Sequence, residues 1–316
     1  MTKQSSFNPL DAYFEKGGNF IDTANFYQSG SSESTIGEWA EKRGIRDQLF
    51  IATKYDGPTK LMGDKVAQKV FYVGIGSKAL KLAIAGSPKN LRTDYIDLLY
   101  VHVWTWDTTV EELMKSLHNL VTQGKVLYLG ISDTPAWVAN GASFSALSRE
   151  ESFLPMARSE GMALAPWGVL AAGKLRTDAE EEARIKSGEN GRTFLQSDWK
   201  RNEAERAASL ALEKVAKEVG AKSITSVAIA YVLHKAPFVF PIVGGRKVEQ
   251  LEQNIEALDL SLTEDQIKAL ESVSPNLGFP YYMSGSGDTL SPWLALTGVK
   301  DKVEYPAPIR PVKARL

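Results

Sequence analysis

Short apolar runs alternate with segments of helical periodicity along most of this chain. Each apolar run ends in polar or glycine residues, and we expect strands at 19–23, 49–54, 95–102, 127–131, 162–166 and 238–243. Apolar residues at helical spacing predict helices at 31–43, 110–125, 202–219, 223–235, 248–258 and 263–273. Strands that alternate with helices form parallel βαβ units, so the sequence predicts an α/β protein.

Composition excludes several other classes of protein. The 316 residues are 43% hydrophobic and 24% charged, as in ordinary globular domains, which excludes disorder of the whole chain. The net charge of −1 lacks the basic excess of a nucleic-acid-binding protein, so we expect no nucleic-acid partner. Without cysteine, disulfides and thiolate metal sites are excluded, and three histidines argue against a histidine-built metal site. We therefore expect no bound metal.

Two further features bear on where the protein resides. No run of about 18 apolar residues is present, and the first 18 residues lack the apolar core of a secretory signal. A chain without cysteine also fits a reducing compartment. We expect a cytoplasmic protein that is not bound to a membrane.

Residues that can carry chemistry stand at or just beyond the ends of the expected strands. They are Asp22, Lys54, His102, Ser132 and Gly244. In α/β barrels the carboxyl ends of the strands hold the active site, so this pattern favours a TIM-type (β/α)8 barrel. Only six of the eight strands of such a barrel are found.

The motifs around these positions resemble those of the aldo-keto reductases. The resemblance covers residues 7 to about 275 and is closest to the fungal branch of aryl-alcohol dehydrogenases and norsolorinic acid reductases. The motifs are FIDTANFYQ (20–28), IATK (51–54), LRTDYIDLLYVH (91–102), GKVLYLGISD (124–133), MALAPWGVLAAGKL (162–175) and FPIVGGRKVEQLEQNIEAL (240–258). The resemblance implies an NADP-dependent oxidoreductase that reduces an aryl or polyketide-like aldehyde or ketone in fungal secondary metabolism.

The resemblance also implies a catalytic tetrad of Asp22, Tyr27, Lys54 and His102. A free tyrosine has a pKa near 10, and a neighbouring ammonium lowers this pKa by stabilising the phenolate. Tyr27 would then donate a proton to the carbonyl oxygen, Lys54 would supply the ammonium, Asp22 would hold Lys54, and His102 would orient the carbonyl. Taken singly, each residue has an ordinary explanation, as a turn cap, a rim aromatic, a surface lysine or a structural histidine.

The remaining site residues are carried over from the same resemblance. Ser132 and Asp133 match a Ser-Asn pair that holds the nicotinamide carboxamide, and residues 166–174 match a loop that crosses the cofactor pyrophosphate. The GGRK stretch opens a helix, where backbone N–H groups and Arg246 suit the 2′-phosphate of NADP. The expected cofactor-binding residues are Asp22, Ser132, Asp133, Pro166, Trp167, Gly168, Gly173, Lys174, Gly244, Gly245, Arg246, Lys247, Gln250, Gln253 and Asn254. His102, Trp104 and Trp106 are candidates to line the substrate pocket, although packing is an equal alternative for both tryptophans.

The chain also departs from the family pattern. The family's N-terminal hairpin, first strand and sixth strand find no counterpart, and Gly86 and Pro88 stand where the family has an uninterrupted helix. Three explanations stay open: an incomplete gene model, a catalytically degenerate or non-enzymatic relative, or a second chain, including another copy, that covers the open strand edges. We expect the barrel at 1–274, a tail or closing loop at 275–316, and a surface insertion at 177–200.

Overall fold

The computed structural model describes residues 3–55, 68–139, 153–188, 190–191, 193 and 198–273. The chain divides into two compact units, and each is described by itself. Unit 1 comprises Met1–Asn19 and Ala146–Phe279, and unit 2 comprises Phe20–Ser145 and Pro280–Leu316. The expected tail, 275–316, lies outside the described residues.

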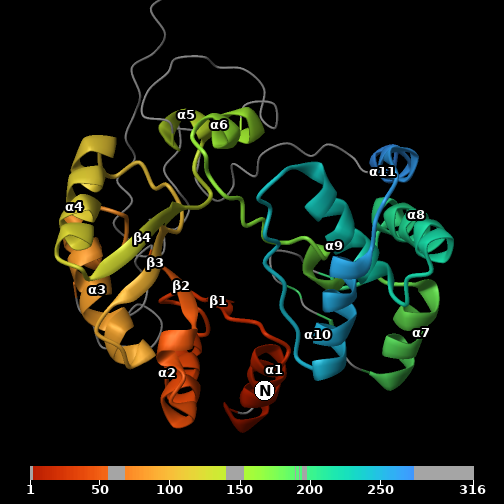
Figure 1. Ribbon diagram of the computed structural model, residues 1–316, viewed down its shortest axis with the longest axis horizontal. Helices are drawn as coiled ribbons and strands as arrows, with labels where there is room; N and C mark the ends of the chain where they lie inside the picture. The colour runs from red at the N-terminus through yellow and green to blue at the C-terminus, as the bar shows by residue number, and fades with distance from the viewer. Residues whose placement is uncertain are drawn as a thin grey trace, which may run out of the picture. The chain divides into compact units, whose positions relative to one another are not determined.

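Unit 2 is built on a parallel sheet of four strands in the order β1-β2-β3-β4 (Figure 1). The strands are β1 (Phe20–Asp22), β2 (Phe50–Tyr55), β3 (Ile96–Val101) and β4 (Val126–Ile131). The helices of this unit are α2 (Ser31–Arg43), α3 (Ser77–Leu91), α4 (Val110–Thr122) and the short α5 (Ala136–Ala139). Four of the expected strands are thereby confirmed, with ends that shift by at most one residue.

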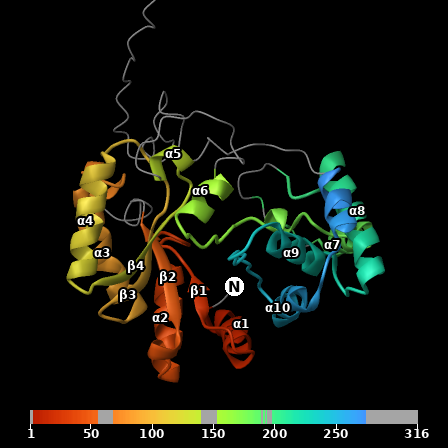
Figure 2. The same cartoon turned by 45° about the horizontal axis from the view of Figure 1, so that its top comes forward.

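Helices α2, α3 and α4 pack on one side of this sheet, as a second view also shows (Figure 2). The core between them contains Leu99 and Val101 of β3, Leu80 of α3 and Leu113 and Leu117 of α4, all nearly inaccessible to solvent. Parallel strands joined by helices must bury both faces, which explains their nearly continuous apolar sequence. Polar residues lie at or just beyond the carboxyl ends of these strands.

Helix α3 runs through the position where Pro88 was expected to disturb it. Pro88 stands in the last turn, three residues before the end of the helix, so the hydrogen bond that its missing N–H would have made belongs to the helix end. Arg92 then ends the helix in a left-handed conformation, with φ of 55°. Pro88 therefore does not interrupt the helix.

Unit 1 is mainly helical. It contains α1 (Lys3–Glu15), α6 (Phe153–Ser159), α7 (Asp178–Ser187), α8 (Glu203–Val219), α9 (Ile224–Lys235), α10 (Val248–Ile255) and α11 (Glu264–Glu271). Its core joins α8, α9 and α11 through Leu212, Val227 and Leu270. The helices expected from periodicity at 202–219, 223–235, 248–258 and 263–273 are confirmed, the last two ending earlier than expected.

One expectation for unit 1 needs correction. Segments 162–166 and 238–243 form one isolated parallel bridge, Leu164 with Val239, instead of two full strands. Pro166 lacks the N–H that would continue the ladder, which explains the interruption. In the segment at 177–200, which was expected to be a surface insertion, the described residues include α7, whose side chains are mostly exposed apart from the buried Glu181.

Candidate active site

The carboxyl ends of β1, β2 and β3 bring three of the expected catalytic residues together. Backbone pairing continues past the strands, since the N–H of Asn25 donates to the carbonyl of Lys54 at 3.0 Å and the N–H of His102 donates to that of Tyr55 at 3.1 Å. Asp22, at the end of β1, pairs in register with β2. The parallel topology therefore places the first polar residue of each connection at the same edge of the sheet.

Lys54 is the centre of this group. Its ammonium donates to Asp22 Oδ2 at 2.6 Å, to the Thr23 carbonyl at 2.8 Å and to Tyr27 Oη at 3.4 Å, and its side chain is only 5% exposed. A lysine ammonium has three donors and no acceptor. The hydroxyl hydrogen of Tyr27 must therefore point to an acceptor other than Lys54.

Burial shifts the pKa values of both Asp22 and His102. It raises the pKa of Asp22, while the Lys54 ammonium opposes the shift, and Asp22 Oδ1 is buried with no hydrogen-bond partner among the described residues. Burial first, and the Lys54 charge second, lower the pKa of His102 to about 3. His102 is therefore a neutral imidazole at physiological pH, and its ring lies 5.7 Å from that of Tyr27, nearly perpendicular to it.

Glu33 is a supporting residue that sequence reasoning missed. It lies in the first turn of α2, is fully buried, and accepts hydrogen bonds from Thr53 Oγ1 at 2.7 Å and Asn90 Nδ2 at 3.0 Å. It thereby links α2 to the residue before Lys54 and to α3. An acidic residue in the first turn of a helix is common, so nothing in the sequence marks this one as buried.

The two tryptophans after His102 pack together, with ring centroids 5.9 Å apart and planes nearly perpendicular. Trp104 is 4% exposed and belongs to the core cluster between the sheet and α3 and α4, and the partly buried Trp106 packs against that cluster. These contacts agree with the alternative that both tryptophans serve in packing. Their role as substrate-contacting residues stays a prediction.

Ser132 and Asp133 follow β4 at the same edge of the sheet. The N–H of Ser132 donates to the carbonyl of Val101 at 2.9 Å, and the carbonyl of Asp133 accepts from the Trp104 N–H at 3.4 Å. Asp133 adopts φ of 40°, a left-handed conformation that Asp and Asn tolerate better than most residues. Both residues are half-buried.

In unit 1, a parallel pairing brings two expected cofactor-binding loops to one edge. The N–H of Phe240 donates to the Leu164 carbonyl at 2.7 Å, and the N–H of Ile242 donates to the Pro166 carbonyl at 2.9 Å. The loop after Pro166 and the loop that contains Gly244 therefore begin side by side. Sequence order alone separates these loops by more than seventy residues.

The first of these loops has an unusual backbone. Gly168, Ala171, Ala172 and Gly173 all have positive φ, between 47° and 84°. Positive φ is strained for the two alanines and is tolerated mainly where surrounding structure or function requires it. Trp167 at the start of the loop is 45% exposed, whereas Lys174 at its end is buried and paired with Glu205.

The second loop leads into α10. Gln250 Oε1 accepts from the N–H groups of Arg246 at 2.7 Å and Lys247 at 3.2 Å, which caps the start of the helix. The side chains of Arg246, Lys247 and Gln253 are exposed, while Asn254 is 8% exposed. Two cationic side chains thus flank exposed glycines at a helix start.

The comparisons with known proteins agree with this geometry. The model of the aldo/keto reductase family matches residues 1–275. The chain belongs to the aldo/keto reductase family. Aldo/keto reductases are oxidoreductases with a TIM-barrel fold, and the four parallel strands of unit 2 are part of such an α/β architecture.

Several curated aldo/keto reductases are similar to this chain over most of its length. An aryl-alcohol dehydrogenase [NADP(+)] of Phanerodontia chrysosporium is 52% identical, covering 99% of the chain and 87% of the relative. A norsolorinic acid reductase of Aspergillus flavus is 46% identical over 87% of the chain and 73% of the relative. A norsolorinic acid reductase of Emericella nidulans is 44% identical over 89% of the chain and 75% of the relative. The recognition made from the motifs is confirmed.

Aldo/keto reductases use nicotinamide cofactors, and the residues present fit such a group. In unit 2, the buried Asp22 Oδ1 without a described partner leaves an acceptor in the site. In unit 1, no described heavy atom lies within 4 Å of the position that a Cβ would take at Gly168 or Gly244. A cofactor could therefore approach the backbone closely at both glycines. Among the described residues no group of three or more acidic or histidine side chains could hold a metal ion.

Proposed function

We propose that this protein is an NADP-dependent reductase of aryl or polyketide-like aldehydes and ketones. The observation that carries the proposal is the Lys54 ammonium, which donates to the Asp22 carboxylate and to the Tyr27 hydroxyl at the same time. A carbonyl reductase needs a proton donor whose conjugate base is stabilised, and this arrangement supplies both.

In the proposed reaction Tyr27 is the general acid. When bound, the nicotinamide supplies the hydride. As negative charge develops on the substrate oxygen, Tyr27 gives up its hydroxyl proton, and the resulting phenolate lies beside the Lys54 ammonium. Asp22 holds Lys54 in place and balances its charge.

His102 orients the substrate carbonyl in this proposal. An imidazole with a pKa of about 3 carries one N–H at neutral pH and no charge. It can donate one hydrogen bond to the carbonyl oxygen without competing with Tyr27 as an acid. The contact of Tyr27 and His102 rings supports a shared oxygen position.

The cofactor contacts proposed for unit 1 follow from charge and access. Arg246 and Lys247 are exposed cations at the start of α10 and suit the 2′-phosphate of NADP. The strained loop from Trp167 to Lys174 would lie along the pyrophosphate. Gly245, Gln250, Gln253 and Asn254 would contact the adenosine side, and Ser132 and Asp133 of unit 2 the carboxamide.

The substrate class is proposed from the relatives. The names of the similar proteins refer to aryl alcohols and to norsolorinic acid. We propose that this chain acts on the same classes, in secondary metabolism and in the cytoplasm, a compartment that suits a chain without cysteine. Among the described helices none is long and apolar enough to cross a membrane.

The test uses the purified full-length chain with NADPH and a series of aryl aldehydes. We expect a change in nicotinamide fluorescence on binding and NADPH consumption that depends on the aldehyde. Binding without turnover would instead indicate a non-catalytic relative, and absence of both would contradict the proposal. The limits of the barrel at 1–274 stay a prediction, which limited proteolysis can test.

A further inference from the structure

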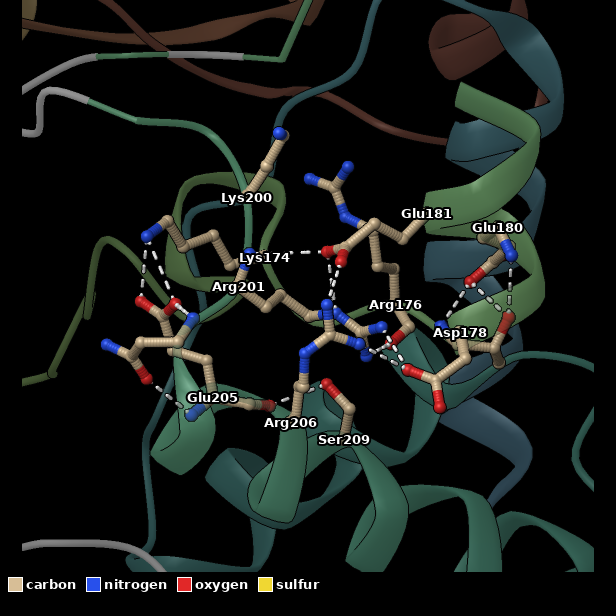
Figure 3. A network of polar contacts seen from close by, with 12 residues as sticks. Lys174, Arg176, Asp178, Glu180, Glu181, Lys200, Arg201, Glu205, Arg206 and Ser209 are labelled. Atoms are coloured by element: carbon tan, nitrogen blue, oxygen red, sulfur yellow. Dashed lines mark hydrogen bonds and ion pairs between the residues drawn. The ribbon is translucent and has the colours of Figure 1, made fainter. Parts of the chain in front are cut away.

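A network of charged residues surrounds the end of the strained loop in unit 1 (Figure 3). Its centre is Arg201, whose side chain is 1% exposed. Arg201 Nε donates to Glu181 Oε2 at 2.9 Å, and its guanidinium also bonds Asp178 and the carbonyl of Arg176. The network therefore ties α7 and the chain just after Lys174 to the start of α8.

Lys174 and Glu205 form a separate pair beside this network. The Lys174 ammonium lies 3.0 Å from the Glu205 carboxylate, and the two side chains are 8% and 19% exposed. A mostly buried ammonium needs a counter-ion, because removing a charge from water without one is strongly unfavourable. Glu205 is the counter-ion that the described residues give to Lys174.

Glu205 itself is fixed independently of Lys174. It is the third residue of α8, and its Oε2 accepts from the Asn202 N–H at 2.8 Å while the Asn202 side chain accepts from the Glu205 N–H at 2.9 Å. This capping box holds the carboxylate in place even when Lys174 turns away. The backbone segments that carry Lys174 and Glu205 are also linked, because the guanidinium of Arg201, next to Asn202, donates to the carbonyl of Arg176.

We propose that Glu205 competes with the cofactor phosphates for the Lys174 ammonium and so limits how long the cofactor stays bound. The inference rests on the cofactor-binding role proposed for Lys174. Lys174 can bind a phosphate only by sharing or giving up its contact with the fixed Glu205 carboxylate. This competition weakens cofactor binding and speeds its release.

Glu205→Gln isolates this effect. A glutamine at this position still accepts the Asn202 N–H, so the cap is kept while the negative charge is removed. We expect NADPH to bind roughly 5- to 20-fold more tightly and to dissociate more slowly, as measured by fluorescence titration and stopped-flow displacement. NADH should gain by a similar factor, because both cofactors carry the pyrophosphate.

Two controls separate this effect from a general change in charge or folding. Glu203→Gln removes the same charge from an exposed residue in the same helical turn and should leave both constants unchanged. In a Lys174→Met background, Glu205→Gln should no longer tighten binding, because the competed-for ammonium is gone. A gain that persists without Lys174 would overturn the inference.

The outcomes also separate this inference from the proposed function. If the wild-type chain binds NADPH but Glu205→Gln binds it no more tightly, the competition is wrong and the proposed function stands. If Glu205→Gln weakens binding, Glu205 positions Lys174 for the cofactor and does not compete with it, which also overturns the inference. If the wild-type chain binds no nicotinamide cofactor, both are wrong.

Discussion

Single buried side chains decide which groups in the site carry charge. The Lys54 ammonium is 5% exposed and donates to two oxygen acceptors besides the Tyr27 hydroxyl, one of them the Asp22 carboxylate at 2.6 Å. Burial first, and the Lys54 charge second, lower the pKa of the similarly buried His102 to about 3, so its imidazole is neutral at physiological pH.

Tyr27→Phe tests the proton donor. Removing only the phenol oxygen should lower kcat for aldehyde reduction by about 10²- to 10⁴-fold, the usual contribution of a general acid. NADPH affinity should change little, which a fluorescence titration of the same sample checks. Near wild-type turnover would show that another group donates the proton.

His102 should make stability depend on pH. Its pKa is about 3 in the folded protein and about 6.5 when unfolded, so between these values the unfolded state binds the extra proton. Stability from this group is therefore complete above pH 6.5 and falls as pH decreases towards 3, by up to about 1.4 kcal/mol per pH unit.

Denaturant unfolding at pH 7.5, 6 and 5 measures this dependence. The variant His102→Gln, which cannot titrate, should lose stability less steeply over the same range than the wild type. His118→Gln, which changes an exposed histidine of α4, is the matched control and should follow the wild type. Parallel curves for His102→Gln and the wild type would contradict the assigned charge state.

Element ends, more than element interiors, carry the site. Periodicity is enough to locate helices such as α4, α8 and α9, because one face of each is buried. Strand prediction failed for 162–166 and 238–243, where Pro166 lacks the N–H that would continue the ladder. Even so, three backbone hydrogen bonds suffice to bring the two loops that follow to one edge.

Arg246→Ala tests the start of α10. Losing a charge-assisted contact to the 2′-phosphate should weaken NADPH binding by about 1.5–3 kcal/mol, or roughly 10- to 150-fold. NADH lacks that phosphate and should bind almost as before, which gives an internal control. Equal losses for both cofactors would mean that Arg246 supports the loop and does not select the cofactor.

At the scale of the whole molecule, the described sheet ends at β4 with apolar side chains exposed. Leu127, Tyr128 and Leu129 are 45%, 60% and 37% exposed, although strands of a parallel barrel are built for burial on both faces. The alignment with the Phanerodontia relative spans 336 positions, more than the 316 residues of this chain, so that relative carries segments that this chain lacks.

We expect this chain to be less stable than a chimera that carries the relative's sequence between the counterparts of Ser132 and Gly161. Covering a few hundred Å² of apolar surface contributes several kcal/mol at about 25 cal/mol per Å². Thermal unfolding and light scattering of the two proteins measure the difference and any self-association. A soluble monomer that melts as high as the chimera would show that no strand is missing.

The sequence by itself determined the fold class, the family and the order of the motifs, because apolar periodicity and local motif patterns are properties of neighbouring residues. The resemblance of its motifs to the aldo-keto reductases was enough to nominate Asp22, Tyr27, Lys54 and His102 as the catalytic tetrad. Only the tertiary structure decided the charge of His102, the burial of Glu33 and the pairing of Lys174 with Glu205. These depend on which distant segments exclude water from a side chain or supply its counter-ion, and no local pattern encodes that.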